Sequence, residues 1–301
     1  MKIIDFYGKR RIFFAISLFI FLLGLIMSFV NGIKLDIYFQ GGAMLKYTYE
    51  GEIDANAAGE VAEGVVDRAA SAQITTDLAT EEKHLIINIA GNFGLAAEDQ
   101  QALDKALKES FPNAELTLSE SSMVEPFFGK LFLRKGILSV LLSLALVMLY
   151  VWVRFRRIGG LSAGVMALVA LMHDLLVVFF TCVIFSIPIG DSFIAVALSI
   201  IGYSINDTIV IYDRIRENYK RYSKLPIETL TNLSITQSMM RSINTNVAVM
   251  ISVSLVYILA FGHGVSSIES FALPMAVGAI SGCYSTVCIT GPIWVMWKKR
   301  K

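Results

Sequence analysis

The sequence predicts an α-helical membrane protein with six transmembrane helices and a small α+β ferredoxin-like domain outside the cytoplasm. Of its 301 residues, 55% are hydrophobic and 17% are charged, whereas soluble domains carry about 25% charged residues. The apolar residues gather in six long runs, and a bilayer core requires roughly 20 of them in one helix. Residues 32–133 contain no such run. The predicted organisation is therefore a cytoplasmic N-terminus with the first helix (1–31), a globular domain (32–133), and five helices with loops and a basic tail (134–301).

The first apolar run, like a secretory signal peptide, follows a basic segment. It contains 19 residues, more than the apolar core of a signal peptide, and no small-x-small cleavage site follows it. We therefore expect an uncleaved helix. All six runs are expected to be helical, because a lipid-exposed strand would leave backbone groups unpaired. They are Ile12–Val30, Gly136–Val153, Leu161–Ile187, Ile189–Ile211, Ile243–Phe261 and Phe271–Trp297.

Basic residues predict the orientation, since they are retained on the cytoplasmic side of a membrane. With six spans, all four basic clusters fall on one side, so both termini are expected in the cytoplasm. The clusters are Lys2 with Lys9–Arg11, Arg154–Arg157, Arg214–Lys224, and Lys298–Lys301. The basic tail would also suit nucleic acid or anionic lipid. Topology alone explains it, so we expect membrane lipid but no nucleic acid as a partner.

The external region carries 17 acidic and 7 basic side chains. Its pattern predicts the element order β-α-β-β-α-β, the split βαβ or ferredoxin-like arrangement. The lone His84 is expected to be a solvated residue at a strand end. The expected strands are Ile37–Tyr49, Ala72–Leu78, Leu85–Ala90 and Ala114–Leu118, and the expected helices are Ala57–Ala70 and Ala96–Ser110.

Ionisable residues inside the spans are the most informative, because each costs about 2.5–3.5 kcal/mol at the centre of a membrane helix and therefore faces protein or water. His173 and Asp174 lie in the middle of the third span, and Asp207 lies in the fourth. Arg241 precedes the fifth apolar run. Burial favours the neutral form of a carboxylic acid, whereas a nearby guanidinium favours the ionised form. Asp207 and Arg241 are therefore candidates for a proton-transport pair, and a static buried pair or an arginine that extends to the headgroups is the alternative.

Polar and small residues surround these candidates. Ser204 and Thr208 share a helical face with Asp207, while Gly278 and Gly282 form a G-x-x-x-G pattern that permits close helix packing. The three cysteines lie in apolar runs, so neither a disulfide framework nor a thiolate metal site is expected. The sequence lacks a phosphate-binding glycine loop, zinc-ligand spacing and a nucleophile triad. We expect no enzyme activity, no metal and no cofactor.

The fourth span ends in the segment GYSINDTIVIYDRIREN, which runs from Gly202 to Asn218 and includes Asn206, Asp213 and Arg214. This segment closely resembles the fourth-helix signature of the SecF family, the smaller subunits of the bacterial SecDF protein-export complex. Three further features agree. The sequence FQGG, with Phe39, Gly41 and Gly42, resembles the family's Phe-x-Gly-Gly motif, and the region from Gly278 to Pro292 resembles its glycine-rich sixth helix. The segment from Arg241 to Thr245 lies at the fifth helix, where the family carries an arginine.

The resemblance implies membership of the RND (resistance-nodulation-division) superfamily and a location in the bacterial inner membrane. It also implies SecD, the SecYEG channel and the unfolded preprotein as partners. Asp207 would carry the proton and Arg241 would be its charge partner. Ser204, Asn206, Thr208, His173 and Asp174 would support them. Two alternatives remain: a scaffold subunit that moves no protons, and a small-molecule efflux half-transporter.

Overall fold

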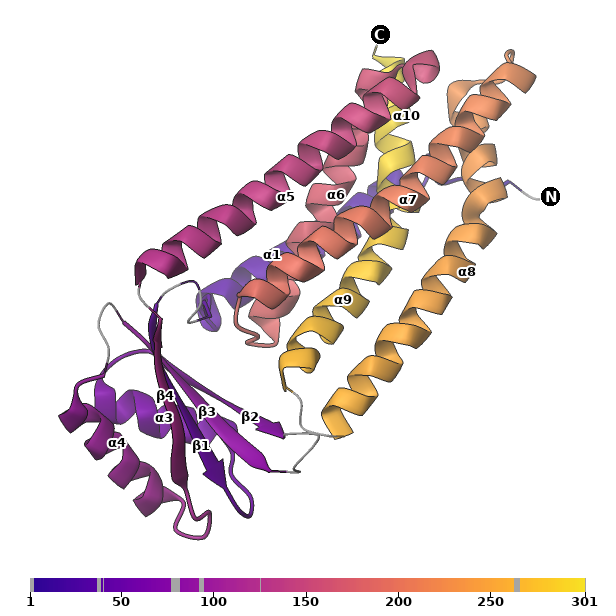
Figure 1. The fold of residues 1–301 in the computed structure, drawn as a ribbon. Coiled ribbons are helices and arrows are strands. Elements are labelled where there is room, and N and C mark those ends of the chain that lie inside the picture. The colour runs from indigo at the N-terminus through magenta and orange to yellow at the C-terminus, as the bar shows by residue number, and fades with distance from the viewer. Residues whose placement is uncertain are drawn as a thin grey trace.

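The computed structural model describes residues 3–36, 39, 41–76, 82–91, 95–124, 126–262 and 266–300. Within these ranges, a bundle of long helices stands beside a small domain that contains one sheet and two helices (Figure 1). At the end of the bundle away from the sheet, the segment before α1 contacts the last helix, where the Nζ atom of Lys299 lies 5.1 Å from the ring centre of Tyr7.

Among the described residues, six helices of the bundle are long and apolar enough to cross a membrane, as predicted. The first five are α1 (Arg10–Val30), α5 (Pro126–Arg154), α6 (Gly160–Ile184), α7 (Asp191–Arg221) and α8 (Ile227–Gly262). The sixth combines α9 (Ser266–Tyr284), the π-helix η2 (Ser285–Thr290) and α10 (Gly291–Lys299).

Several helices extend beyond the predicted apolar runs. The largest differences are in α8, which begins sixteen residues before Ile243, and in α5 and α7: α5 begins ten residues before Gly136, and α7 continues ten residues past Ile211. Hydropathy measures only the part of a helix that suits lipid, whereas backbone hydrogen bonding continues into the polar extension. The extensions of α7 and α8 pack on each other, and Asn218 Nδ2 of α7 donates to Ser234 Oγ of α8 at 2.9 Å.

Three spans form the centre of the bundle and three form its periphery. In the most apolar 18-residue stretch of each span, about half of the residues are buried in α6, α7 and the last span (56%, 50% and 56%). In α1, α5 and α8 only 11% of them are buried. Polar side chains that face α6, α7 or α9 are therefore shielded within this single chain.

The small domain contains a four-stranded sheet in the order β2-β3-β1-β4, with every neighbouring pair antiparallel. Its hydrophobic core joins alternate residues of the sheet, such as Leu45 and Tyr47, to Ala58 of α3 and Leu103 of α4. The elements in chain order are β1 (Gly42–Tyr49), α3 (Ala55–Val66), β2 (Ala70–Thr76), β3 (Lys83–Ala90), α4 (Ala97–Ser110) and β4 (Thr117–Val124).

Three details of this domain differ from the prediction. Helix α3 ends at Val66 because Asp67 adopts a positive φ of 50°. Strand β4 continues to Val124 through the polar segment SESS, because its backbone pairs with β1 whatever its side chains are. The prediction of a solvated His84 is wrong: this residue is buried, and its Nδ1 lies 3.2 Å from Thr48 Oγ1. Predicted strand positions 37, 38, 77 and 78 lie outside the described residues.

The FQGG segment joins the domain to the bundle. Phe39 packs against Cys182 and Ile189 at one end of α6 and α7. Gly41 and Gly42 have φ values of 81° and 146°, which favour glycine. A Cβ atom on Gly42 would lie 2.0 Å from the Ile89 carbonyl oxygen. Gln40 lies outside the described residues. The two glycines therefore allow the backbone conformation with which the chain enters β1.

Candidate functional site

Asp174 is the centre of a polar cluster inside the bundle. Its side chain is 0% exposed, and its carboxylate accepts hydrogen bonds from three serine hydroxyls of two other spans. Ser204 of α7 donates to Oδ2 at 2.7 Å, Ser285 of η2 to Oδ2 at 2.8 Å, and Ser281 of α9 to Oδ1 at 2.7 Å. Three central spans are thus joined at one carboxylate.

The cluster continues through His173 toward α1. The Nδ1 atom of His173 lies 3.2 Å from Asp174 Oδ1, and its Nε2 atom lies 3.1 Å from Ser17 Oγ of α1. Ser17 in turn contacts the Tyr284 hydroxyl at 3.1 Å, and this hydroxyl donates to the Phe13 carbonyl at 2.6 Å. Histidine and hydroxyl groups can both donate and accept, so the arrangement forms a continuous hydrogen-bonded chain between α6 and α1.

Asp207 lies one helical turn beyond Ser204, on the side of α7 that faces α8. It is 2% exposed, and its Oδ2 accepts a hydrogen bond from Asn246 Nδ2 at 3.1 Å. The neighbouring Thr208 Oγ1 lies 3.1 Å from Thr286 Oγ1 of η2. The two buried acids therefore belong to adjacent clusters, which are linked through α7 and η2.

The π-helix η2 brings its side chains into both clusters. Ser285 reaches Asp174, and the next residue, Thr286, reaches Thr208. Thr290 Oγ1 donates to the Ser285 carbonyl at 3.1 Å, five residues earlier. Segments of π-helix are rare and are frequent at functional sites. Here the wider turn allows consecutive side chains to serve two different carboxylate clusters.

No hydrogen bond joins Arg241 to Asp207 among the described residues. Arg241 lies on α8, where its side chain is exposed, and it forms no ion pair within the ranges that the structure describes. The position opposite Asp207 is taken instead by Asn246, five residues further along α8. Asn206 and Gly202 lie on the exposed face of α7. Of the predicted set, the structure thus brings together Asp174, His173 and Ser204, and separately places Thr208 beside Asp207.

The end of the α7 signature anchors the extension of this helix. Asp213 pairs with Arg154 of α5 at 3.0 Å and with Arg216 at 2.8 Å. Arg214 Nε donates to Gln237 Oε1 of α8 at 2.7 Å. These contacts hold three helices together at the end of the bundle where the chain termini lie.

The two glycines of α9 lie at close helix contacts. A Cβ atom on Gly278 would lie 2.7 Å from Ile200 Cδ1 and 2.8 Å from Val178 Cγ2. On Gly282 it would lie 3.1 Å from Ser204 Cβ. The small residues allow α9 to approach α6 and α7, which lets Ser281 and Ser285 reach Asp174.

Sequence reasoning missed the partners in the last two spans. Ser281 and Ser285 are four residues apart, so they share one helical face, and this spacing was an available signal, whereas Thr286 is one residue further on and had none. Asn246 had no comparable signal among the polar residues that follow Arg241. Within the described part of the chain, no three His, Cys, Asp or Glu side chains are grouped as metal ligands.

Comparisons with known proteins agree with this architecture. The family model described as protein export membrane protein SecD/SecF, C-terminal, matches residues 102–300. Protein translocase subunit SecF of Petrotoga mobilis is 32% identical, over 100% of this chain and 98% of the relative. The same subunit of Anaerolinea thermophila is 33% identical, over 98% and 94%.

Solved structures of SecDF show the same fold. SecDF from Thermus thermophilus, described as a translocon-associated membrane protein, aligns with a TM-score of 0.78 at 28% identity. A crystal structure of SecDF in a super-membrane-facing form aligns with a TM-score of 0.71. The alignments cover 99% and 100% of this chain but 39% of each SecDF chain. The chain is a multi-pass membrane protein that belongs to the SecF family of protein-export membrane proteins.

Proposed function

We propose that this protein is a subunit of a membrane complex that uses the proton motive force to assist protein export through the Sec channel. Asp207 is the proton-carrying acid in this proposal, and the observation that carries it is the burial of this carboxylate beside a second buried acid, Asp174. A buried carboxyl group in a membrane bundle is expensive to keep, and two of them in neighbouring polar clusters, separated by the one turn of α7 between Ser204 and Asp207, suit proton transfer better than packing.

The energy available is sufficient for such a role. One elementary charge that crosses 100 mV releases about 2.3 kcal/mol, which is several times RT. A ligand or proton shifts a conformational equilibrium by its differential affinity for the two states. Protonation of Asp207 would weaken its attraction for a cation, so the neutral acid would keep Asn246 as its partner, whereas loss of the proton would favour Arg241 as α8 moves.

The family indicates the partners and the setting. SecF relatives are named translocase subunits, and SecDF chains are more than twice as long as this one. We therefore propose SecD as the partner that supplies the remaining helices, with SecYEG and the preprotein as further partners. The 32–133 domain, with a ferredoxin-like arrangement, would lie outside the cytoplasm, and both termini would face the cytoplasm of a bacterial inner membrane. The role is transport rather than catalysis.

The test replaces Asp207 by Asn, which keeps the size of the side chain and prevents ionisation. Secretion of a reporter protein is followed in cells with an intact and with a collapsed proton motive force. We expect Asp207→Asn to reduce secretion to the rate seen after collapse. The control is Asp191→Asn, at the exposed start of α7, which should secrete normally.

The secretion assay, together with measurements of complex assembly and drug sensitivity, separates the alternatives. Normal secretion by Asp207→Asn, together with loss of complex assembly in Gly278→Leu, would replace the motor by a scaffold. Changed sensitivity to drugs with normal secretion would indicate an efflux half-transporter.

A further inference from the structure

Strand β2 has a free edge. It is the terminal strand in the order β2-β3-β1-β4, and within the described part of the chain it pairs only with β3. Ala90 N donates to the Ala69 carbonyl at 2.9 Å, so positions 69 and 90 form a hydrogen-bonded pair. Such pairs alternate along an antiparallel ladder, and the β2–β3 register has no interruption. Ala70, Ala72, Ile74 and Thr76 therefore direct their backbone groups away from β3.

The sequence of β2 does not protect this edge. Natural sheets usually guard an edge strand with charged residues, proline or a bulge, but the segment ASAQITT contains none of these. The opposite edge strand, β4, carries Glu120, and its register with β1 shifts between Lys46 and Tyr47. The two edges thus differ, and β2 is the one that can accept another strand.

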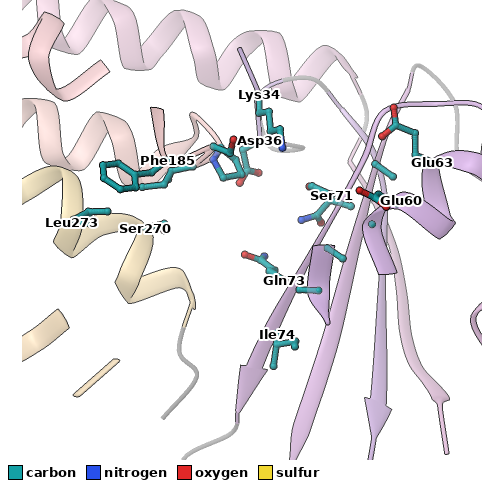
Figure 2. A pocket seen from close by; sticks show the side chains of 18 of the residues that line it. Lys34, Asp36, Glu60, Glu63, Ser71, Gln73, Ile74, Phe185, Ser270 and Leu273 are labelled. Atoms are coloured by element: carbon teal, nitrogen blue, oxygen red, sulfur yellow. The ribbon is translucent and has the colours of Figure 1, made fainter. Parts of the chain in front are cut away.

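The β2 edge faces a cleft of about 920 Å³ between the sheet and the helix bundle. Figure 2 shows Ser71, Gln73 and Ile74 on one side of it, and Phe185 and Leu273 on the other. The wall on the bundle side is largely apolar, with Ile187, Pro188, Tyr257 and Phe261 as further members. The wall on the domain side also contains the exposed carboxylates of Glu60 and Glu63 on α3.

We propose that this cleft binds an extended segment of unfolded polypeptide, which pairs with β2 as an added strand. Strand addition uses backbone hydrogen bonds for affinity and side-chain pockets for preference. Backbone pairing is independent of sequence, so it suits a protein that handles many different exported chains. The apolar wall contacts hydrophobic side chains, and the acidic wall favours basic segments. This inference rests on the proposed export function, since an exported chain is the unfolded polypeptide that reaches this side of the membrane.

The first experiment places a photo-crosslinking amino acid at Gln73 in the full chain, in membranes that hold an arrested secretory precursor. The matched control places it at Glu120, because the register puts Gln73, Ile86, Lys46 and Glu120 in one row across the same sheet face. We expect at least tenfold more precursor adduct from Gln73. Equal adducts from both positions, or adducts from Gln73 only with another membrane protein, would overturn the proposal.

The second experiment measures binding to the purified full chain in detergent. The probe is fluorescently labelled ribonuclease A, reduced and carboxamidomethylated so that it stays unfolded and basic. Ile74→Pro removes an outward N–H and obstructs strand pairing, so binding should weaken by about tenfold, which corresponds to the loss of roughly one hydrogen bond. Ile74→Ala removes more apolar surface but keeps the N–H, and it should bind within twofold of the unsubstituted chain.

Equal weakening by both substitutions would refute the strand-pairing mechanism, as would equal binding of native folded ribonuclease A. Circular dichroism checks the fold of Ile74→Pro. If that variant is unfolded, the crosslinking experiment alone tests the proposal. If Asp207→Asn loses secretion driven by the proton motive force while both experiments here fail, the export function stands and the cleft assignment falls.

Discussion

Replacement of Asp174 by Ala should destabilise the helix bundle more than any exposed substitution. Hydrogen bonds to a charged group contribute about 1.5–3 kcal/mol each, and Asp174 accepts three of them from serines at 2.7–2.8 Å. Such contributions do not add fully. The substitution also leaves buried serine hydroxyls without their acceptor, and an unsatisfied buried polar group costs about 1–3 kcal/mol. We therefore expect Asp174→Ala to lower the free energy of unfolding by about 4 kcal/mol.

Asp174→Asn keeps one acceptor oxygen and should lower the same quantity by about 2 kcal/mol. The assay is unfolding of the purified chain in mixed micelles with increasing dodecyl sulfate, followed by far-ultraviolet circular dichroism. Asp191→Asn, an exposed carboxylate at the start of α7, is the control and should change stability by less than about 0.5 kcal/mol. A loss below about 1 kcal/mol for Asp174→Ala would refute the view that this carboxylate joins the three spans.

Three further outcomes follow from the geometry. Gly278→Ala should cost about 1–3 kcal/mol through overpacking, whereas Gly202→Ala, with open space around its Cβ position, should be neutral or stabilising; the same micelle assay compares them. Gly42→Ala should disrupt the sheet and increase proteolysis of the 41–124 region, whereas Gly32→Ala, which has a positive φ but no close neighbour, should do so much less. Burial raises the pKa of Tyr47 above its usual value of 10. The phenol ionises first in the unfolded chain, so stability should be complete below about pH 10 and fall as the pH rises further. Burial also raises the pKa of Tyr49, so Tyr47→Phe should reduce this dependence, followed by circular dichroism between about pH 8 and 12, without abolishing it.

The spans and the individual helices and strands were predictable because their signals are local. A run of apolar residues is long enough to cross a bilayer whatever its neighbours are, and alternation marks a strand face. His84 shows the limit of this reasoning. Its neighbours in sequence suggested an exposed strand end, but the register with β1 places Thr48 beside it, and register is a property of two strands.

For the site inside the membrane spans too, the residues were predictable from the sequence and their contacts were not. The sequence alone identified Asp174, Asp207 and Arg241, because a charge inside an apolar run is conspicuous at any position. Only the tertiary structure decided which groups meet them: Asn246 rather than Arg241 faces Asp207, and three serines surround Asp174. Those contacts depend on the rotation, depth and close approach of neighbouring helices, and on the π-turn in the last span. The hydropathy of one segment carries no information about these quantities.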